Sequence, residues 1–189
     1  MRITGGQARG IALKSPRGRA VRPATDRMRE AVFSSLADRV AGRRFLDLFA
    51  GTGAYGLEAL SRGAAGGVFV ERSRPAVAAL RENLDAVRRS MGPGGADLPV
   101  RVYCRDVLSW CPAEEERADL VFADPPYSEM EKCLSGLAGR LDKFLLSDSE
   151  PLLVLESPGG TPATLPGWRC VKTLGKGTGQ PTCGLWVRG

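Results

Sequence analysis

Phe45-Leu46-Asp47-Leu48-Phe49-Ala50-Gly51-Thr52-Gly53-Ala54-Tyr55-Gly56 is the stretch that decides the fold of this chain. It joins an apolar strand, expected over 45–49, to a helix expected over 56–62, through a turn that satisfies G-x-G-x-x-G. The glycines let the backbone approach a ligand, and the helix N-terminus offers free N–H donors. The arrangement predicts a Rossmann-like unit that binds a ligand at this turn. A tight packing turn without a ligand is the structural alternative.

Short apolar runs alternate with helical periodicity along most of the chain. Further strands are expected over 67–70, 100–103, 120–123 and 152–155, with two closing strands near 169–174 and 182–187. Further helices are expected from an N-cap at Thr25 or Asp26, over 75–90 and over 130–146. This pattern predicts an α/β fold with a seven-stranded, mostly parallel sheet, one antiparallel strand and helices on both faces.

Acidic residues lie at or near the carboxyl ends of four predicted strands, where ligands of such sheets bind. Glu71 lies 20 residues after Gly51, the position at which an acid binds ribose hydroxyls. Asp106 could accept a hydrogen bond from an adenine amino group, and Asp47 could meet a ligand ammonium. Each acid alone is more often a loop residue or a cap. Together they favour a nucleoside with a positively charged tail, such as S-adenosylmethionine, over the pyrophosphate of NAD.

Asp124-Pro125-Pro126-Tyr127 follows the apolar run that ends at Ala123. Two consecutive prolines cannot donate to a sheet ladder, and they force an extended, rigid backbone. The strand therefore stops in a fixed turn that presents a carboxylate, a proline carbonyl and an aromatic ring. These groups suit a flat ring with an exocyclic amine. A proline-rich turn capped by Asp124 is the alternative.

The composition bounds the class of protein. At 189 residues, the chain has the length of one domain. It has no run of about 18 apolar residues and no apolar N-terminal run typical of a signal peptide, so we expect a cytoplasmic protein without a membrane partner. It contains no histidine, and its five cysteines form no Cys-x-x-Cys pair. We therefore expect no imidazole chemistry and no metal site.

The basic charge is concentrated at the N-terminus. Residues 1–30 hold eight basic and two acidic residues, which accounts for the whole net charge of +6. A basic arm on a neutral body indicates a polyanion partner, although a solvated arm is the alternative. We expect residues 1–40 to form a basic hairpin and helix, and 41–189 the main domain. The RNA-binding candidates, three of them expected near the exposed start of the helix, are Arg2, Arg9, Arg22, Arg27 and Arg29.

The chain resembles the class I S-adenosylmethionine-dependent methyltransferases that carry an [Asn/Asp]-Pro-Pro-[Tyr/Phe] motif and methylate exocyclic amines. Within them it resembles, over nearly its whole length, the RsmD-type small-subunit ribosomal RNA guanine-N2 methyltransferases. Two features depart from the family pattern: Glu71 is followed by Arg72-Ser73 without a second acid, and the tip of the last hairpin, 176–180, matches loosely. The resemblance is carried by Arg2-Ile3-Thr4-Gly5-Gly6 with Arg9-Gly10, by 22–30, by 46–53 continuing through 56–63, and by 121–127.

The resemblance implies S-adenosylmethionine as cofactor and a guanine of 16S ribosomal RNA as substrate, guanine 966 in the nomenclature of the family. It implies action on the small subunit or an assembly intermediate, by a monomer. The implied catalytic residues are Asp124, Pro125, Pro126 and Tyr127. The implied cofactor-binding residues are Asp47, Phe49, Ala50, Gly51, Thr52, Gly53, Glu71, Asp106 and Asp124.

Three other functions remain open at this stage. Adenine-N6 and cytosine-N4 methyltransferases use the same kind of turn, although the compact chain lacks an obvious DNA target-recognition domain. A noncatalytic RNA-binding or ribosome-assembly factor could retain a methyltransferase scaffold. A dinucleotide oxidoreductase shares the glycine-rich turn, but NAD enzymes usually need a second Rossmann half, for which the chain is too short.

Overall fold

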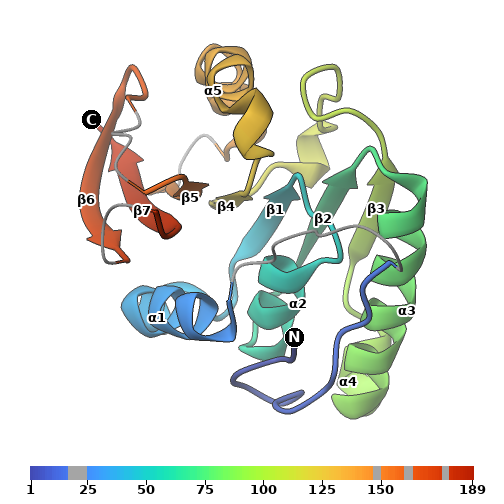
Figure 1. Cartoon of the computed structure of the whole chain (residues 1–189). Coiled ribbons are helices and arrows are strands. Elements are labelled where there is room, and N and C mark those ends of the chain that lie inside the picture. The colour runs from blue at the N-terminus through green and yellow to red at the C-terminus, as the bar shows by residue number, and fades with distance from the viewer. Residues whose placement is uncertain (17–24, 147–149, 160–163, 176–178) are drawn as a thin grey trace.

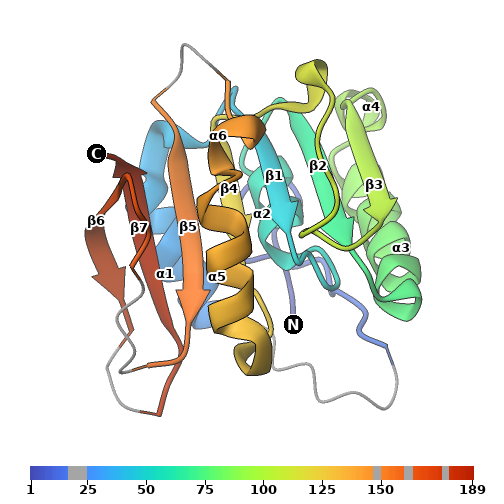
Figure 2. The same ribbon diagram turned by 90° about the horizontal axis from the view of Figure 1, so that it is seen from above.

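The computed structural model describes residues 1–16, 25–146, 150–159, 164–175 and 179–189. In this part of the chain seven strands form one sheet in the order β3-β2-β1-β4-β5-β7-β6 (Figures 1 and 2). Strands β1 to β5 pair in parallel, and β7 runs antiparallel to both of its neighbours, β5 and β6. The predicted α/β fold with one reversed strand is confirmed.

The strands are β1 (Arg44–Leu48), β2 (Gly66–Glu71), β3 (Val100–Cys104), β4 (Leu120–Ala123), β5 (Leu152–Ser157), β6 (Trp168–Leu174) and β7 (Thr182–Arg188). The α-helices are α1 (Asp26–Leu36), α2 (Ala54–Ser61), α3 (Arg74–Ser90), α4 (Pro93–Ala96), α5 (Met130–Ala138) and α6 (Leu141–Phe144). Short 3-10 helices are η1 (Ala37–Arg39), η2 (Glu114–Glu116) and η3 (Tyr127–Glu129). No described helix is long and apolar enough to span a bilayer.

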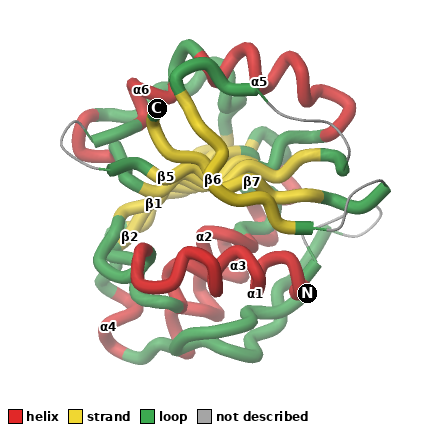
Figure 3. Tube along the Cα trace, turned by 90° about the vertical axis from the view of Figure 1, so that its left-hand side faces the viewer, coloured by secondary structure: helices red, strands yellow, loops and turns green. Residues whose placement is uncertain are grey.

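Helices cover both faces of the sheet. Figure 3 shows α1, α2, α3 and α4 on one side of the strands, and α5 and α6 on the other. Side chains of a strand point alternately to the two faces, so Leu120 and Phe122 of β4 belong to the core under α1–α3, whereas Val121 and Ala123 belong to the core under α5 and α6. Burial on both faces explains why the central strands are nearly continuous apolar runs.

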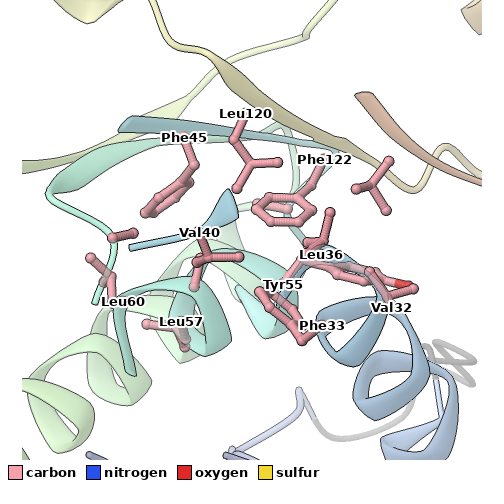
Figure 4. Close-up of a cluster of buried hydrophobic side chains, with 14 of the residues drawn as sticks. Val32, Phe33, Leu36, Val40, Phe45, Tyr55, Leu57, Leu60, Leu120 and Phe122 are labelled. Carbon is pink, nitrogen blue, oxygen red and sulfur yellow. The ribbon is translucent and has the colours of Figure 1, made fainter. Parts of the chain in front are cut away.

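Aromatic rings join α1 and α2 to the centre of the sheet. Tyr55 of α2 stacks on Phe122 with ring centroids 5.4 Å apart, and Phe33 of α1 lies 5.6 Å from the same ring (Figure 4). Thr25 is the N-cap of α1, since its side chain accepts a hydrogen bond from the Met28 N–H. These contacts fix α1 beside the helix that begins at the glycine-rich turn.

The N-terminal residues form a small hairpin that is part of the main core. Arg2 and Ala12 form an antiparallel bridge, and Ile3 and Leu13 are buried in the same cluster as the core of the sheet. A Cβ at Gly6, whose φ is +78°, would lie 1.9 Å from the Ser61 carbonyl oxygen of α2. The Thr4-Gly5-Gly6 segment therefore needs glycine because the hairpin packs directly on α2.

One predicted helix is wrong in its extent. The helix expected over 130–146 ends at Ala138, and α6 follows as a separate single turn. The Arg140 guanidinium donates to the carbonyls of Val107, Leu108 and Trp110, and the chain beyond Phe144 forms a bridge with Ala118. These long-range contacts redirect the backbone where the apolar periodicity continues.

Candidate functional site

The glycine-rich turn connects the carboxyl end of β1 to the N-terminus of α2. Phe49, Gly51 and Gly53 all have positive φ, at 60°, 55° and 84°. A Cβ added at Gly53 would press on Leu80, whereas one at Gly51 would meet nothing within 4 Å. Gly53 therefore serves packing, and Gly51 borders open space where a ligand can approach the backbone. Buried Ala50 and Thr52 lie in the same turn.

Glu71 ends β2 beside this turn and stabilises it. Its carboxylate accepts from the Gly51 N–H at 2.9 Å and from the Ser73 N–H at 2.7 Å. Since Leu48 and Val70 are register partners of the parallel β1–β2 pair, the two strands end together. Gly51 and Glu71 are therefore in direct contact at the carboxyl edge of the sheet.

Asp106 follows β3 at the same edge of the sheet and is exposed. Its carboxylate accepts from the Leu108 N–H at 2.8 Å, and so caps the turn that follows. The neighbouring strands β2 and β3 end in register at Glu71 and Cys104. Asp106 therefore lies at the same carboxyl edge of the sheet as Glu71, one strand further along, which is where the sequence predicts it.

Asp47 differs from the other acids because it is buried beneath the glycine-rich turn. Only 2% of its surface is exposed, and its carboxylate accepts from the Gly56 N–H of α2 at 2.9 Å. Burial raises the pKa of Asp47 to about 8, an effect to which the Glu71 charge adds. In this structure Asp47 fixes the start of α2.

The Asp124-Pro125-Pro126-Tyr127 turn begins where β4 ends, directly beside the end of β1. Leu48 and Ala123 are register partners, and the Asp124 N–H donates to the Leu48 carbonyl at 3.5 Å. Pro125 is buried and Pro126 exposed, and Tyr127 presents 39% of its surface to solvent. The Asp124–Tyr127 segment, called the acceptor turn below because it presents a carboxylate and a carbonyl as hydrogen-bond acceptors, is thus adjacent to the glycine-rich turn because their strands are paired.

Glu156 lies beside the Asp124–Tyr127 turn, although the sequence did not single it out. It lies in β5, one residue beyond the Ala123–Leu155 register pair, so it flanks Asp124 across adjacent strands. It is 2% exposed and accepts from the Tyr55 hydroxyl at 2.9 Å and the Tyr127 hydroxyl at 3.3 Å. The signal that singles out Asp124, an acid just after a short apolar run, is also present at Glu156, which follows the apolar run 152–155.

The carboxyls of Asp124 and Glu156 influence each other. Burial raises the pKa of Asp124 well above its ordinary value, and the charges of Glu156 and Asp47 raise it further. Burial also raises the pKa of Glu156, whereas the two phenol donors and the Arg29 charge oppose this shift. The carboxyls of Asp124 and Glu156 therefore lie close enough to interact, beside the hydroxyl donors of Tyr55 and Tyr127.

The candidate RNA-binding arginines separate into three groups. Arg2, Arg9 and Arg27 are exposed, whereas Arg22 lies outside the described residues. The exposure expected for Arg29 is wrong, since its side chain is fully buried and pairs with Asp26 and Glu58. Arg29 stands in a charged stretch, between Arg27 and Glu30, but the N-terminal hairpin covers it, and its guanidinium donates to the Arg2 carbonyl. Arg29 is therefore a structural residue.

Comparisons with known proteins agree with this geometry. The profile of a family described as Conserved hypothetical protein 95 matches residues 1–185. Ribosomal RNA small subunit methyltransferase D of Escherichia coli is 37% identical over 172 residues, which cover 89% of this chain and 81% of that protein. A solved structure of yhhF from Escherichia coli superposes with a TM-score of 0.78 at 34% identity, covering 100% of this chain and 97% of that one. A hypothetical protein of Thermus thermophilus gives a TM-score of 0.73 at 33% identity, with 98% of each chain covered.

Proposed function

We propose that this chain, which belongs to the Conserved hypothetical protein 95 family of RsmD-type S-adenosylmethionine-dependent methyltransferases, methylates the exocyclic N2 of a guanine in small-subunit ribosomal RNA. The observation that carries the proposal is the adjacency of two turns, the glycine-rich turn after β1 and Asp124-Pro125-Pro126-Tyr127 after β4. One suits a nucleoside cofactor, and the other suits a planar amine. The finer target, guanine 966 of 16S RNA, follows from the family resemblance.

The residues around the glycine-rich turn fit S-adenosylmethionine. Open space at Gly51 lies beside the Glu71 carboxylate, which accepts hydrogen bonds and so suits ribose hydroxyls. Exposed Asp106 suits the adenine amino group one strand further along. Asp47, which holds Gly56, and the turn residues Phe49, Ala50, Thr52 and Gly53 shape this site. When bound, the cofactor supplies a methyl group already activated on sulfonium.

The acceptor turn holds and orients the target amine. A guanine N2 amine is a poor nucleophile because its lone pair is delocalised into the ring. Hydrogen bonds from this amine to the Asp124 carboxylate and the Pro125 carbonyl would orient it and offset the positive charge that develops on nitrogen. Pro126 keeps the turn rigid, and exposed Tyr127 offers a face on which the base stacks. Such a base must be unpaired or flipped out of its helix.

The RNA backbone would be bound by the exposed arginines of the N-terminal hairpin and α1. Arg2, Arg9 and Arg27 present their charges to solvent, in a chain with a net charge of +6. Phosphate contacts of this kind release counterions, so binding should weaken steeply as salt rises. We propose that the protein acts on a small subunit or an assembly intermediate, where such an RNA surface is preformed.

The test incubates purified protein and labelled S-adenosylmethionine separately with small subunits, naked 16S RNA and DNA. Digestion to nucleosides should yield N2-methylguanosine from RNA. N6-methyladenine or N4-methylcytosine would overturn the guanine assignment. No transfer, together with no cofactor binding by calorimetry, would favour a noncatalytic assembly factor.

Two variants test the role of Asp124. Asp124→Ala should abolish transfer while leaving cofactor affinity intact, because the carboxyl faces the amine. Asp124→Asn keeps an acceptor oxygen but loses the charge, and should retain a small fraction of the rate. An Asp124→Ala variant with wild-type activity would refute the assigned role.

A further inference from the structure

Glu156 is a buried carboxyl beneath the acceptor turn that the function proposed above does not use. We propose that Glu156 is a positioning residue of the methyl-acceptor site, which holds the Tyr127 ring in place and controls the ionisation of Asp124. The inference deepens the proposed function and rests on it, since Tyr127 and Asp124 are the residues assigned to the target base.

The position of Glu156 follows from strand register and alternation. Asp124 and Glu156 each come one residue after the register pair Ala123–Leu155 of the parallel strands β4 and β5. Phe122 and Val154, two residues earlier in each strand, both belong to the core under α1–α3. Because side chains two apart share a face, both carboxyls point toward this same side of the sheet.

Glu156 connects two phenols that lie on different elements. One carboxylate oxygen accepts from the hydroxyl of Tyr55 at 2.9 Å, and the other accepts from the hydroxyl of Tyr127 at 3.3 Å. Tyr55 is 5% exposed and stacks on Phe122, so it is held firmly by the core. Tyr127 is on the surface, where a ring has more freedom. Glu156 therefore anchors the exposed ring to the rigid one.

This connection links the two halves of the site. Tyr55 belongs to the glycine-rich motif, as the residue directly before Gly56, whose N–H binds Asp47. The chain of contacts runs from the turn assigned to the cofactor, through Tyr55 and Glu156, to the ring assigned to the target base. A shift of α2 would thus be transmitted to Tyr127 through one carboxylate.

The second part of the proposal concerns protons. Asp124, which is partly buried, and Glu156, which is buried, are carboxyls on neighbouring strands that resist carrying charge together, and they give up their protons in two coupled steps. Glu156 has two phenol donors and the Arg29 charge nearby, so it ionises first, and its charge keeps Asp124 protonated to higher pH. Only ionised Asp124 fully offsets positive charge on the amine. The titratable and charged groups that face the pair are Arg29, Asp47, Tyr55, Tyr127 and Cys183.

The main test compares Glu156→Gln with the matched control Glu116→Gln. Glu116 is also a buried carboxylate bound by a phenol, that of Tyr103, and by Arg101, but it precedes the start of β4 and so lies away from the carboxyl end of the sheet. For each variant, kcat and KM for RNA are measured across pH, together with cofactor affinity by calorimetry.

Glu156→Gln should move the acidic limb of the kcat/KM profile to lower pH, because the neutral amide no longer raises the pKa of Asp124. It should also raise KM for RNA by about tenfold, the value of one hydrogen bond to a charged group, with cofactor affinity unchanged. Glu116→Gln should leave the limb in place. An unmoved limb in Glu156→Gln, or an equal shift in both variants, would overturn the proton-control role.

A second variant isolates the anchoring role. Tyr127→Phe keeps the ring but loses its hydroxyl, and should raise KM for RNA about as much as Glu156→Gln does. The double variant should then be no worse than either single one, since both changes break the same contact. Fully additive effects would contradict the anchor.

A titration that needs no activity separates this inference from the proposed function. The Asp124 resonance in carboxyl carbon-13 spectra is identified by its loss in Asp124→Asn. Its midpoint should fall in Glu156→Gln, because the neighbouring charge that raises the pKa of Asp124 has been removed. A midpoint of Asp124 unchanged in Glu156→Gln would refute the coupling even in a protein that methylates no RNA.

Discussion

Glu58 of α2 is the acceptor on which the docking of the N-terminal hairpin depends. Its fully buried carboxylate accepts from the Thr4 N–H at 2.8 Å, the Thr4 hydroxyl at 2.7 Å and the Gly5 N–H at 2.8 Å. Arg62 donates to it at 2.8 Å, and Nε of buried Arg29 lies 3.7 Å away. Replacing Glu58 by glutamine removes the charge without leaving a cavity, and it turns an NH₂ group toward these donors.

The expected cost follows from the burial of both charges. Removing one partner of a buried ion pair costs about 3–5 kcal/mol. In Glu58→Gln the Asp26 carboxylate, 2.8 Å from the Arg29 guanidinium, still pairs with the Arg29 charge. We therefore expect the lower value, about 3 kcal/mol. With a urea m-value of about 2 kcal/mol/M, the unfolding midpoint should fall by about 1.5 M. The melting temperature should fall by roughly 6–12 °C for a chain of this length.

Urea unfolding followed by circular dichroism measures this loss, with Glu82→Gln as the control. Glu82 pairs with Lys14 at 2.7 Å, but both side chains are mostly exposed, and such surface pairs contribute about 0–1 kcal/mol. Tryptic cleavage after exposed Arg9 should also be faster in Glu58→Gln, because the hairpin detaches first. If Glu58→Gln unfolds at the same urea concentration as Glu82→Gln and the wild type, Glu58 does not anchor the hairpin.

Three further predictions concern the core and the site. Gly56→Ala should destabilise the fold by about 1–3 kcal/mol, because its Cβ would lie 2.3 Å from a ring carbon of Phe69. The control Gly139→Ala, where a Cβ would meet nothing within 4 Å, should leave the stability unchanged. Equal melting temperatures of the two variants would refute the prediction. Burial raises the pKa of Asp47 to about 8, so the folded chain keeps a proton that the unfolded chain loses above about pH 4. The free energy of unfolding should therefore fall as pH rises toward 8, and it should fall less in Asp47→Asn than in the wild type. Urea midpoints measured at pH 5 and pH 8 test this. An equal drop of the midpoint in the wild type and in Asp47→Asn would contradict it. Tyr127→Ala should weaken RNA binding by about 1–3 kcal/mol, the value of one stacked base, without changing cofactor affinity; a filter-binding constant equal to that of the wild type would rule out stacking.

Local patterns in the sequence predicted the strands and most of the helices correctly, and they singled out the two turns of the candidate site. Short apolar runs and turn residues identified all the strands of the described sheet, since these runs and helical periodicity are properties of neighbouring residues. Gly51 and Asp124 could be singled out because a glycine at positive φ and an acid after a strand are recognisable from adjacent positions. The helix end at Ala138 could not, because contacts of Arg140 with a distant loop decide it.

By itself, then, the sequence determined the α/β order, the glycine-rich turn and the rigid acceptor turn, each encoded within a dozen residues. The tertiary structure alone decided which of these segments lie next to one another. Pairing of β1 with β4 places the two turns together, and pairing of β4 with β5 sets Glu156 beside Asp124. Only the packed hairpin shows that Arg29 is buried. The physical reason is that burial, pairing and pKa depend on groups far apart in the chain, which come together only when the sheet and its covering layers form.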